Sequence, residues 1–178
     1  MKILKILKST KLLIAFLSFI TAAAVGVTIW AVFLREDSNT ILTPDYAPVE
    51  TEPHAETIPG DTGEKMESDK GGGSVSLSYS DKITIDLSDG QATLMFANPG
   101  KSNQDMVLQI VIQDTVIIQS GTLSPGHQVT TLDLLNGAEK RLVPGGYEGK
   151  ILVFYYSEET GEKAMVKTEI PISITIRE

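Results

Sequence analysis

The 178-residue sequence contains no cysteine. This absence excludes disulfide bonds, thiolate metal sites, a cysteine nucleophile and the attachment of lipid to a cysteine. Histidine is nearly absent as well, because His54 and His127 are the only two. Tryptophan occurs once, at Trp30, and aromatic residues make up 6% of the chain. The sequence therefore offers few of the side chains from which catalytic and metal centres are usually built.

Sequence motifs of enzyme chemistry are also missing. No phosphate-binding loop, dinucleotide fingerprint, zinc spacing or nucleophile-elbow motif occurs. Glu158, Glu159 and Glu162 cluster, but in a predicted hairpin tip where water solvates them. We therefore expect a non-enzymatic protein without a metal or cofactor. An envelope hydrolase that uses His127 as its base is the alternative, because serine and aspartate are plentiful.

Basic residues are scarce relative to acidic ones, with 15 Lys and Arg against 23 Asp and Glu, which gives a net charge of −8. An acidic surface repels nucleic acid and anionic lipid headgroups. We therefore expect neither as a ligand, whereas a cationic partner is compatible with this charge.

Charge is absent altogether from one long stretch, Leu12 to Leu34. As a helix these residues would span roughly 34 Å, enough to cross a bilayer core of about 30 Å. Lysine-rich flanks stay on the cytoplasmic side. The sequence thus predicts a cytoplasmic tail over 1–11, a transmembrane signal-anchor helix over 12–34, and an extracytoplasmic remainder. The flanking lysines are Lys2, Lys5, Lys8 and Lys11.

A cleaved signal peptide is the competing interpretation of this stretch. The three alanines from Ala22 to Ala24 offer small residues for cleavage. Cleavage there would leave the apolar segment from Val25 to Leu34 at the new N-terminus, and the uncharged run is longer than the usual signal core. We favour an uncleaved, single-pass anchor in a bacterial cell membrane.

Residues 35–73 are predicted to form a disordered, acidic Pro/Gly linker. The segment contains four prolines, at 44, 48, 53 and 59, and its apolar residues follow no period of 2 or 3.6. Gly71 to Gly73 end the segment with a flexible joint.

From Ser74 onward the hydrophobic pattern has a period of two. Val75, Leu77 and Tyr79 alternate with serines, and similar runs recur between turn signals such as Asn98-Pro99-Gly100. About seven strands with no helix of three turns indicate an all-β protein. We therefore expect one antiparallel β-sandwich domain over 74–178.

One turn motif refines this prediction. The sequence Leu142-Val143-Pro144-Gly145-Gly146-Tyr147 resembles the Leu-x-Pro-Gly-x-Tyr corner of fibronectin type III and related immunoglobulin-like sandwiches. The resemblance implies that the Tyr147 hydroxyl bonds back to the backbone and that Leu142 packs beside it, with Pro144 and Gly145 as structural residues. The tryptophan expected on an early core strand of that family is missing, since Trp30 lies in the anchor.

Two loops are candidates for contact with a partner. In an immunoglobulin-like sandwich the loops at 99–104 and 157–163 share one end of the domain. The first carries amide and lysine side chains and the second is acidic. Their candidate residues are Lys101, Asn103, Gln104, Glu158 and Glu159.

The penultimate strand carries a second candidate surface. If Glu148 and Lys150 face outward, then Leu152, Phe154 and Tyr156 follow them, which leaves an apolar stripe outside the core. Tyr147, Ile151, Val153 and Tyr155 then face the core. The alternative is that Leu134, the segment 135–142 or a bulge covers the stripe. In the last strand, Pro171 removes one backbone donor and is typical of an edge strand.

These observations predict a membrane-anchored, extracytoplasmic protein that binds or scaffolds other cell-surface components, as in an adhesin, a pilus or an envelope assembly. The alternative is an accessory subunit of a membrane secretion or transport complex that acts through its transmembrane helix.

Overall fold

The computed structural model describes residues 17–22, 44–68 and 72–178. The chain divides into two compact units, Met1–Ser38 and Asn39–Glu178. In the first unit, residues 17–22 are helical, and the Thr21 hydroxyl donates a hydrogen bond to the carbonyl of Leu17 (2.9 Å). The predicted tail and most of the predicted anchor lie outside the described residues. None of the helical residues described here forms a helix long and apolar enough to span a membrane.

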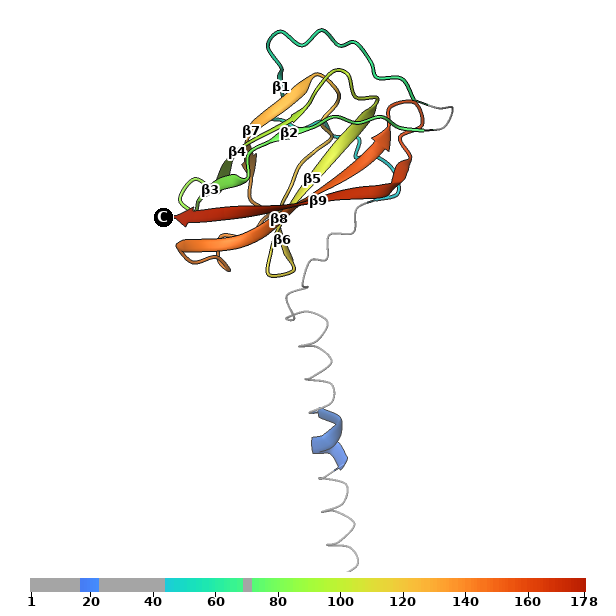
Figure 1. Cartoon of the computed structure of the whole chain (residues 1–178). Coiled ribbons are helices and arrows are strands. Elements are labelled where there is room, and N and C mark those ends of the chain that lie inside the picture. Colours follow the sequence, from blue (N-terminus) through green and yellow to red (C-terminus); the bar gives the residue numbers. More distant parts are fainter. Residues whose placement is uncertain (1–16, 23–43, 69–71) are drawn as a thin grey trace, which may run out of the picture. The chain divides into compact units, whose positions relative to one another are not determined.

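The second unit is built from β-strands (Figure 1). Alternating apolar residues form most of these strands, as the sequence predicts, whereas β1 lies in the expected linker; glycine or Asn-Pro-Gly turns end several strands. The strands are β1 (Glu56–Thr57), β2 (Ser78–Tyr79), β3 (Lys82–Asp86), β4 (Gln91–Asn98), β5 (Gln104–Ile112), β6 (Thr115–Gln119), β7 (His127–Asp133), β8 (Gly145–Ser157) and β9 (Lys163–Arg177).

The strands form a curled sheet in the order β1-β7-β4-β3-β9-β8-β5-β6, with β2 paired to β4. β3 and β9 run parallel, and the other strand pairs between these elements are antiparallel. β3 and β4 lie in one half, β5 and β6 in the other, and the chain then returns through β7 before β8 and β9. The strands confirm the predicted all-β class, but the parallel pair of β3 and β9 departs from the predicted antiparallel arrangement. The immunoglobulin-like branch stays a prediction.

The core lies between the two halves of the curled sheet. It takes alternate residues from β9, of which Ile170, Ile172, Ile174 and Ile176 are all buried, while the residues between them are exposed. β4 and β5 contribute further members such as Phe96. Burial of these side chains is the main stabilising contribution to the fold.

The turn before β8 contains the Tyr147 hydrogen bond. The Tyr147 hydroxyl donates to the carbonyl of Val143, four residues upstream (2.9 Å), and Leu142 packs against the core. Pro144 ends the turn, and β8 begins at Gly145. A hydrogen bond within one turn does not distinguish the fibronectin type III branch from other β folds. Membership of that branch therefore stays a prediction.

The structure differs from the expected linker over residues 44–68, which we call the belt. The belt lies along the sandwich: Ala47 N donates to Gly161 O (2.8 Å), Lys163 N to Asp45 O (2.9 Å) and Glu52 N to Thr122 O (3.0 Å). Farther along, β1 pairs with β7. Prolines exclude regular structure within the belt, but they do not prevent single residues from bonding to strand edges.

Glu52 anchors the middle of the belt. Only 6% of this residue is exposed, and its carboxylate accepts hydrogen bonds from the backbone N–H groups of Gly121 (2.8 Å) and His54 (3.1 Å). Charged hydrogen bonds of this kind offset the cost of burying a carboxylate. An acidic residue that the sequence assigns to a solvated linker is therefore part of the packed domain.

Candidate functional site

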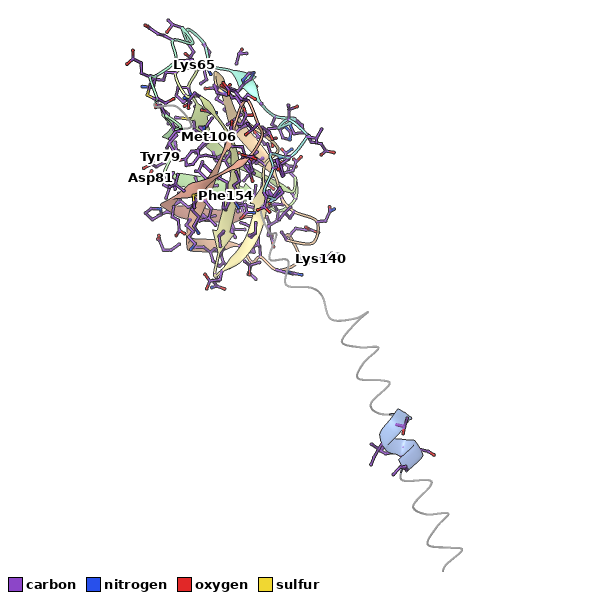
Figure 2. The ribbon with its side chains drawn as sticks, turned by 90° about the vertical axis from the view of Figure 1, so that its right-hand side faces the viewer. Lys65, Tyr79, Asp81, Met106, Lys140 and Phe154 are labelled. Atoms are coloured by element: carbon purple, nitrogen blue, oxygen red, sulfur yellow. The ribbon has the colours of Figure 1, made fainter. Side chains whose placement is uncertain are left out.

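The loops at 99–104 and 157–163 lie at the same end of the sandwich, and Lys65 of the belt connects them. Its Nζ donates to the carbonyl of Ser102 (2.7 Å) and pairs with the Glu158 carboxylate (3.1 Å). Figure 2 shows Lys65 at this end and Lys140 at the other. The predicted arrangement of the two loops is therefore present, with a belt residue between them.

Hydrogen bonds join the belt and the residues after it to most of the candidate polar residues at this end of the sandwich. Met66 N donates to the carbonyl of Lys101 (2.8 Å). The Asn103 side chain accepts from Ser74 N (2.7 Å) and donates to the Ser68 hydroxyl (2.8 Å). Lys101, Asn103 and Glu158 thus hold the chain's own belt and the residues after it, whereas Gln104 and Glu159 face a groove described below. A partner-binding role for these five residues stays a prediction.

Asp105 is a partly buried acid beneath this end. Burial raises the pKa of its carboxyl above the ordinary value, and Glu158 adds to the rise, while the Ser124 hydroxyl and Lys65 oppose it. Its Oδ1 atom is buried without a hydrogen-bond partner among the described residues. Ionisation of Asp105 is therefore less favourable in the folded protein than in the unfolded chain.

Replacing Asp105 by asparagine is expected to raise the Tm by a few degrees at about pH 7. The folded pKa is raised, so the wild type is most stable with Asp105 protonated and loses that contribution as pH rises through the folded pKa. The difference between Asp105→Asn and wild type should vanish near or below about pH 4, where the wild-type carboxyl is neutral too. Thermal unfolding at the two pH values checks this, and a difference that is independent of pH would contradict it.

The apolar stripe of β8 faces away from the core, as predicted, but it is covered. Leu152, Phe154 and Tyr156 form a second cluster with Val107 of β5, and Ala47 of the belt packs against it. Phe154 is 7% exposed and Tyr156 is fully buried.

The belt, and none of the expected elements, provides this cover. The Tyr156 hydroxyl donates to the carbonyl of Pro44 in the belt (3.1 Å). Lys163 of β9 adds to the cover, since its ammonium lies 4.8 Å from the centre of the Phe154 ring. Leu134 and the segment 135–142 pack against the main core, and the register shift between Phe154 and Tyr156 does not turn the stripe inward. In this structure the belt therefore covers the apolar stripe of β8.

A groove of about 480 Å³ opens at the same end of the domain, between the chain that enters β2 and the beginning of β9. Its walls carry exposed apolar side chains: Val75 is 38% exposed, Val166 68% and Met165 fully. Sequence reasoning did not single out these residues as a candidate surface. The adjacent apolar pair Met165-Val166, which departs from strict alternation at the beginning of β9, was the available signal. The groove is lined by Gly72, Gly73, Val75, Gln104, Tyr155, Ser157, Glu159, Thr160, Glu162, Lys163, Ala164, Met165 and Val166.

The two histidines occupy ordinary positions. The His127 ring lies 3.3 and 3.2 Å from the carbonyls of Ser124 and Pro125, and His54 lies 3.1 Å from the Asp133 carboxylate. No group of three metal-ligating side chains occurs in the described part of the chain. The expectation of a non-enzymatic protein stays a prediction.

Comparison with known proteins adds little to this geometry. No family model and no curated protein matches the sequence. Among solved structures, AggA, the major subunit of aggregative adherence fimbriae type I from Escherichia coli, matches with a TM-score of 0.31 and 11% identity over 64% of this chain and 99% of that chain. A protein of unknown function from Porphyromonas gingivalis W83 matches with a TM-score of 0.29 and 15% identity over 56% of this chain and 47% of that chain. Similarity at this level does not assign a function.

Proposed function

We propose that this chain is a non-enzymatic, membrane-anchored protein that presents its sandwich outside the cell and binds another surface protein through the groove. The anchor and its orientation rest on the uncharged stretch from Leu12 to Leu34 and the lysines before it. The groove is the observation that carries the binding role.

The groove combines the features of a protein-recognition surface. Exposed apolar side chains from Val75, Met165 and Val166 adjoin a polar rim that includes Gln104 and Glu159. An apolar centre with a polar rim is the usual composition of a protein–protein contact. The belt fixes the loops beside the groove, so the partner would meet a largely preformed site.

Replacing Val75 by aspartate is expected to weaken partner capture at least about tenfold, because a charge would enter the apolar wall of the groove. Val75 is already partly exposed, so the fold should tolerate the change. The measurement is crosslinking of the full-length protein in intact cells, followed by mass spectrometry of what is captured.

Val143→Asp is the matched control, since Val143 is also exposed but precedes β8, whose far end borders the groove. The length of β8 places the two positions about 40 Å apart. Capture that is unaffected by Val75→Asp, or lost equally in both variants, would refute binding through the groove.

A further inference from the structure

One edge of β9 lacks a strand partner in the described structure. β3 pairs with this edge only from Ser173 onward, and the belt reaches it only at the bridge between Tyr46 and Glu162. Between these points, from Ala164 to Ile172, no described strand lies on the side of β9 opposite β8. Unpaired edges of this kind are templates for strand addition.

The direction of the backbone groups along this edge follows from two hydrogen bonds. Lys163 N donates to Asp45 O and Ser173 N donates to Asp81 O, both away from β8. Because the direction alternates along a strand, Lys167 and Glu169 also point their N–H and C=O groups away from β8. The carbonyl of Pro171 also points away from β8, but proline has no backbone N–H group to donate. The available donors therefore lie on the N-terminal side of Pro171.

We propose that a second copy of this chain pairs antiparallel with this edge, about a two-fold axis at Thr168. In that register each Lys167 lies opposite Glu169 of the other copy, and these residues exchange backbone hydrogen bonds. The proposal concerns association between copies. Val166 also lines the groove, so a second copy on this edge and a partner in the groove would compete for this residue.

The charges of the edge are complementary to themselves in this register. Lys167 and Glu169 lie on the same exposed face of β9, 2.8 Å apart at their charged atoms. Two-fold pairing places each cation opposite an anion of the other copy, so both charge pairs are favourable. A lysine at an edge disfavours most incoming strands, but a strand with the opposite order of charges matches it, and an antiparallel copy has that order.

The other face of β9 is complementary as well. By strand alternation Val166 shares the face of Thr168 and Ile170, yet Val166 is 68% exposed whereas Ile170 is 4% exposed. The two-fold register sets each Val166 beside Ile170 of the second copy. Pairing would therefore cover an apolar side chain that the single chain leaves in water.

Charge reversal in separate copies tests this arrangement. In energy-transfer measurements on the labelled full-length protein in detergent micelles, the wild type should self-associate. Lys167→Glu and Glu169→Lys should each weaken self-association about tenfold, because the symmetry repeats every like-charge pair. A mixture of the two variants should associate as the wild type does, since each Glu then lies opposite a Lys.

This mixture separates the proposed contact from effects within one chain. Each single variant has already lost its own Lys167–Glu169 pair, and Glu169→Lys also loses the ion pair with Lys150 (3.4 Å). Mixing repairs neither loss. Absence of self-association in the wild type, self-association of either variant at wild-type strength, or no recovery in the mixture would each overturn the proposal.

Cysteine crosslinking checks the register, because the chain has no cysteine of its own. A Lys167→Cys copy and a Glu169→Cys copy should form a disulfide with each other, since directly opposed Cα atoms lie about 5.5 Å apart. Lys167→Cys alone should crosslink far less, because equivalent positions are diagonal and about 7–8 Å apart. Equal yields from the mixture and the single variant would overturn the register at Thr168.

Discussion

The Asn98→Asp variant is expected to lose about 4 kcal/mol of unfolding free energy at neutral pH. Asn98 is fully buried, and its Nδ2 donates to the carbonyls of Gln104 (3.0 Å) and Leu123 (2.9 Å). Aspartate has nearly the same shape, but it would present an oxygen to both carbonyls and bury a charge. Urea unfolding at neutral and acidic pH measures the effect. The loss should shrink on acidification, because a protonated carboxyl regains one donor.

Asn103→Asp is the matched control, with the same change a few residues away. The Asn103 oxygen accepts from Ser74 N, which a carboxylate also does, and its amide donates to the Ser68 hydroxyl, which can turn and donate instead. We expect a loss below about 1 kcal/mol. Similar losses in the two variants would show that the Asn98 contacts are not what holds β4 to β5 at this end.

Replacing Gly149 by alanine is expected to lower the unfolding free energy by about 3 kcal/mol. Gly149 lies in β8 between β5 and β9, and a Cβ atom there would be 2.8 Å from the carbonyl oxygen of Val111 and 2.7 Å from Cδ1 of Ile174. The Ile174 side chain can move, but the Val111 carbonyl belongs to the sheet. Relief of the clash therefore requires a shift between β8 and β5. Chemical denaturation measures the loss.

Gly146→Ala in the same strand provides the comparison. A Cβ atom at Gly146 has no atom within 4 Å, and its φ angle is not in the left-handed region. Alanine there should be neutral or stabilising by less than about 1 kcal/mol, because it restricts the unfolded chain. Destabilisation of both variants to the same extent would mean that strand flexibility, and not the contact with Val111, makes glycine necessary at 149.

Local periodicity was sufficient to predict most of the strands, but not β1, which lies in the predicted linker. In β9 the isoleucines from Ile170 to Ile176 alternate with a proline, a serine and a threonine, so the buried face could be identified without knowing what packs against it. The same rule placed Phe154 and Tyr156 on the opposite face of β8. Periodicity shows which side chains share a face, but it contains no information about what covers that face.

The belt could not be predicted for this reason. Its contacts with the sandwich are made by single residues such as Glu52, whose partner Gly121 is 69 positions away. No repeating pattern accompanies contacts of that kind. The groove was missed for a related reason, because Val75 fits its strand pattern and its exposure depends on which distant segments lie beside it.

The bridge between Tyr46 and Glu162 also determines how the domain would respond to mechanical load. A force that pulls residue 44 away from the sandwich would reach the bonds at Gly161 and Lys163 first, then those near Thr122, one after another. Bonds loaded in sequence give way at lower force than the long ladders that join β9 to β8 and β3, which would be loaded together. The belt would therefore detach and extend, to a length of about 80 Å, before the strands of the core carry tension. The domain could then lengthen under load without unfolding its core.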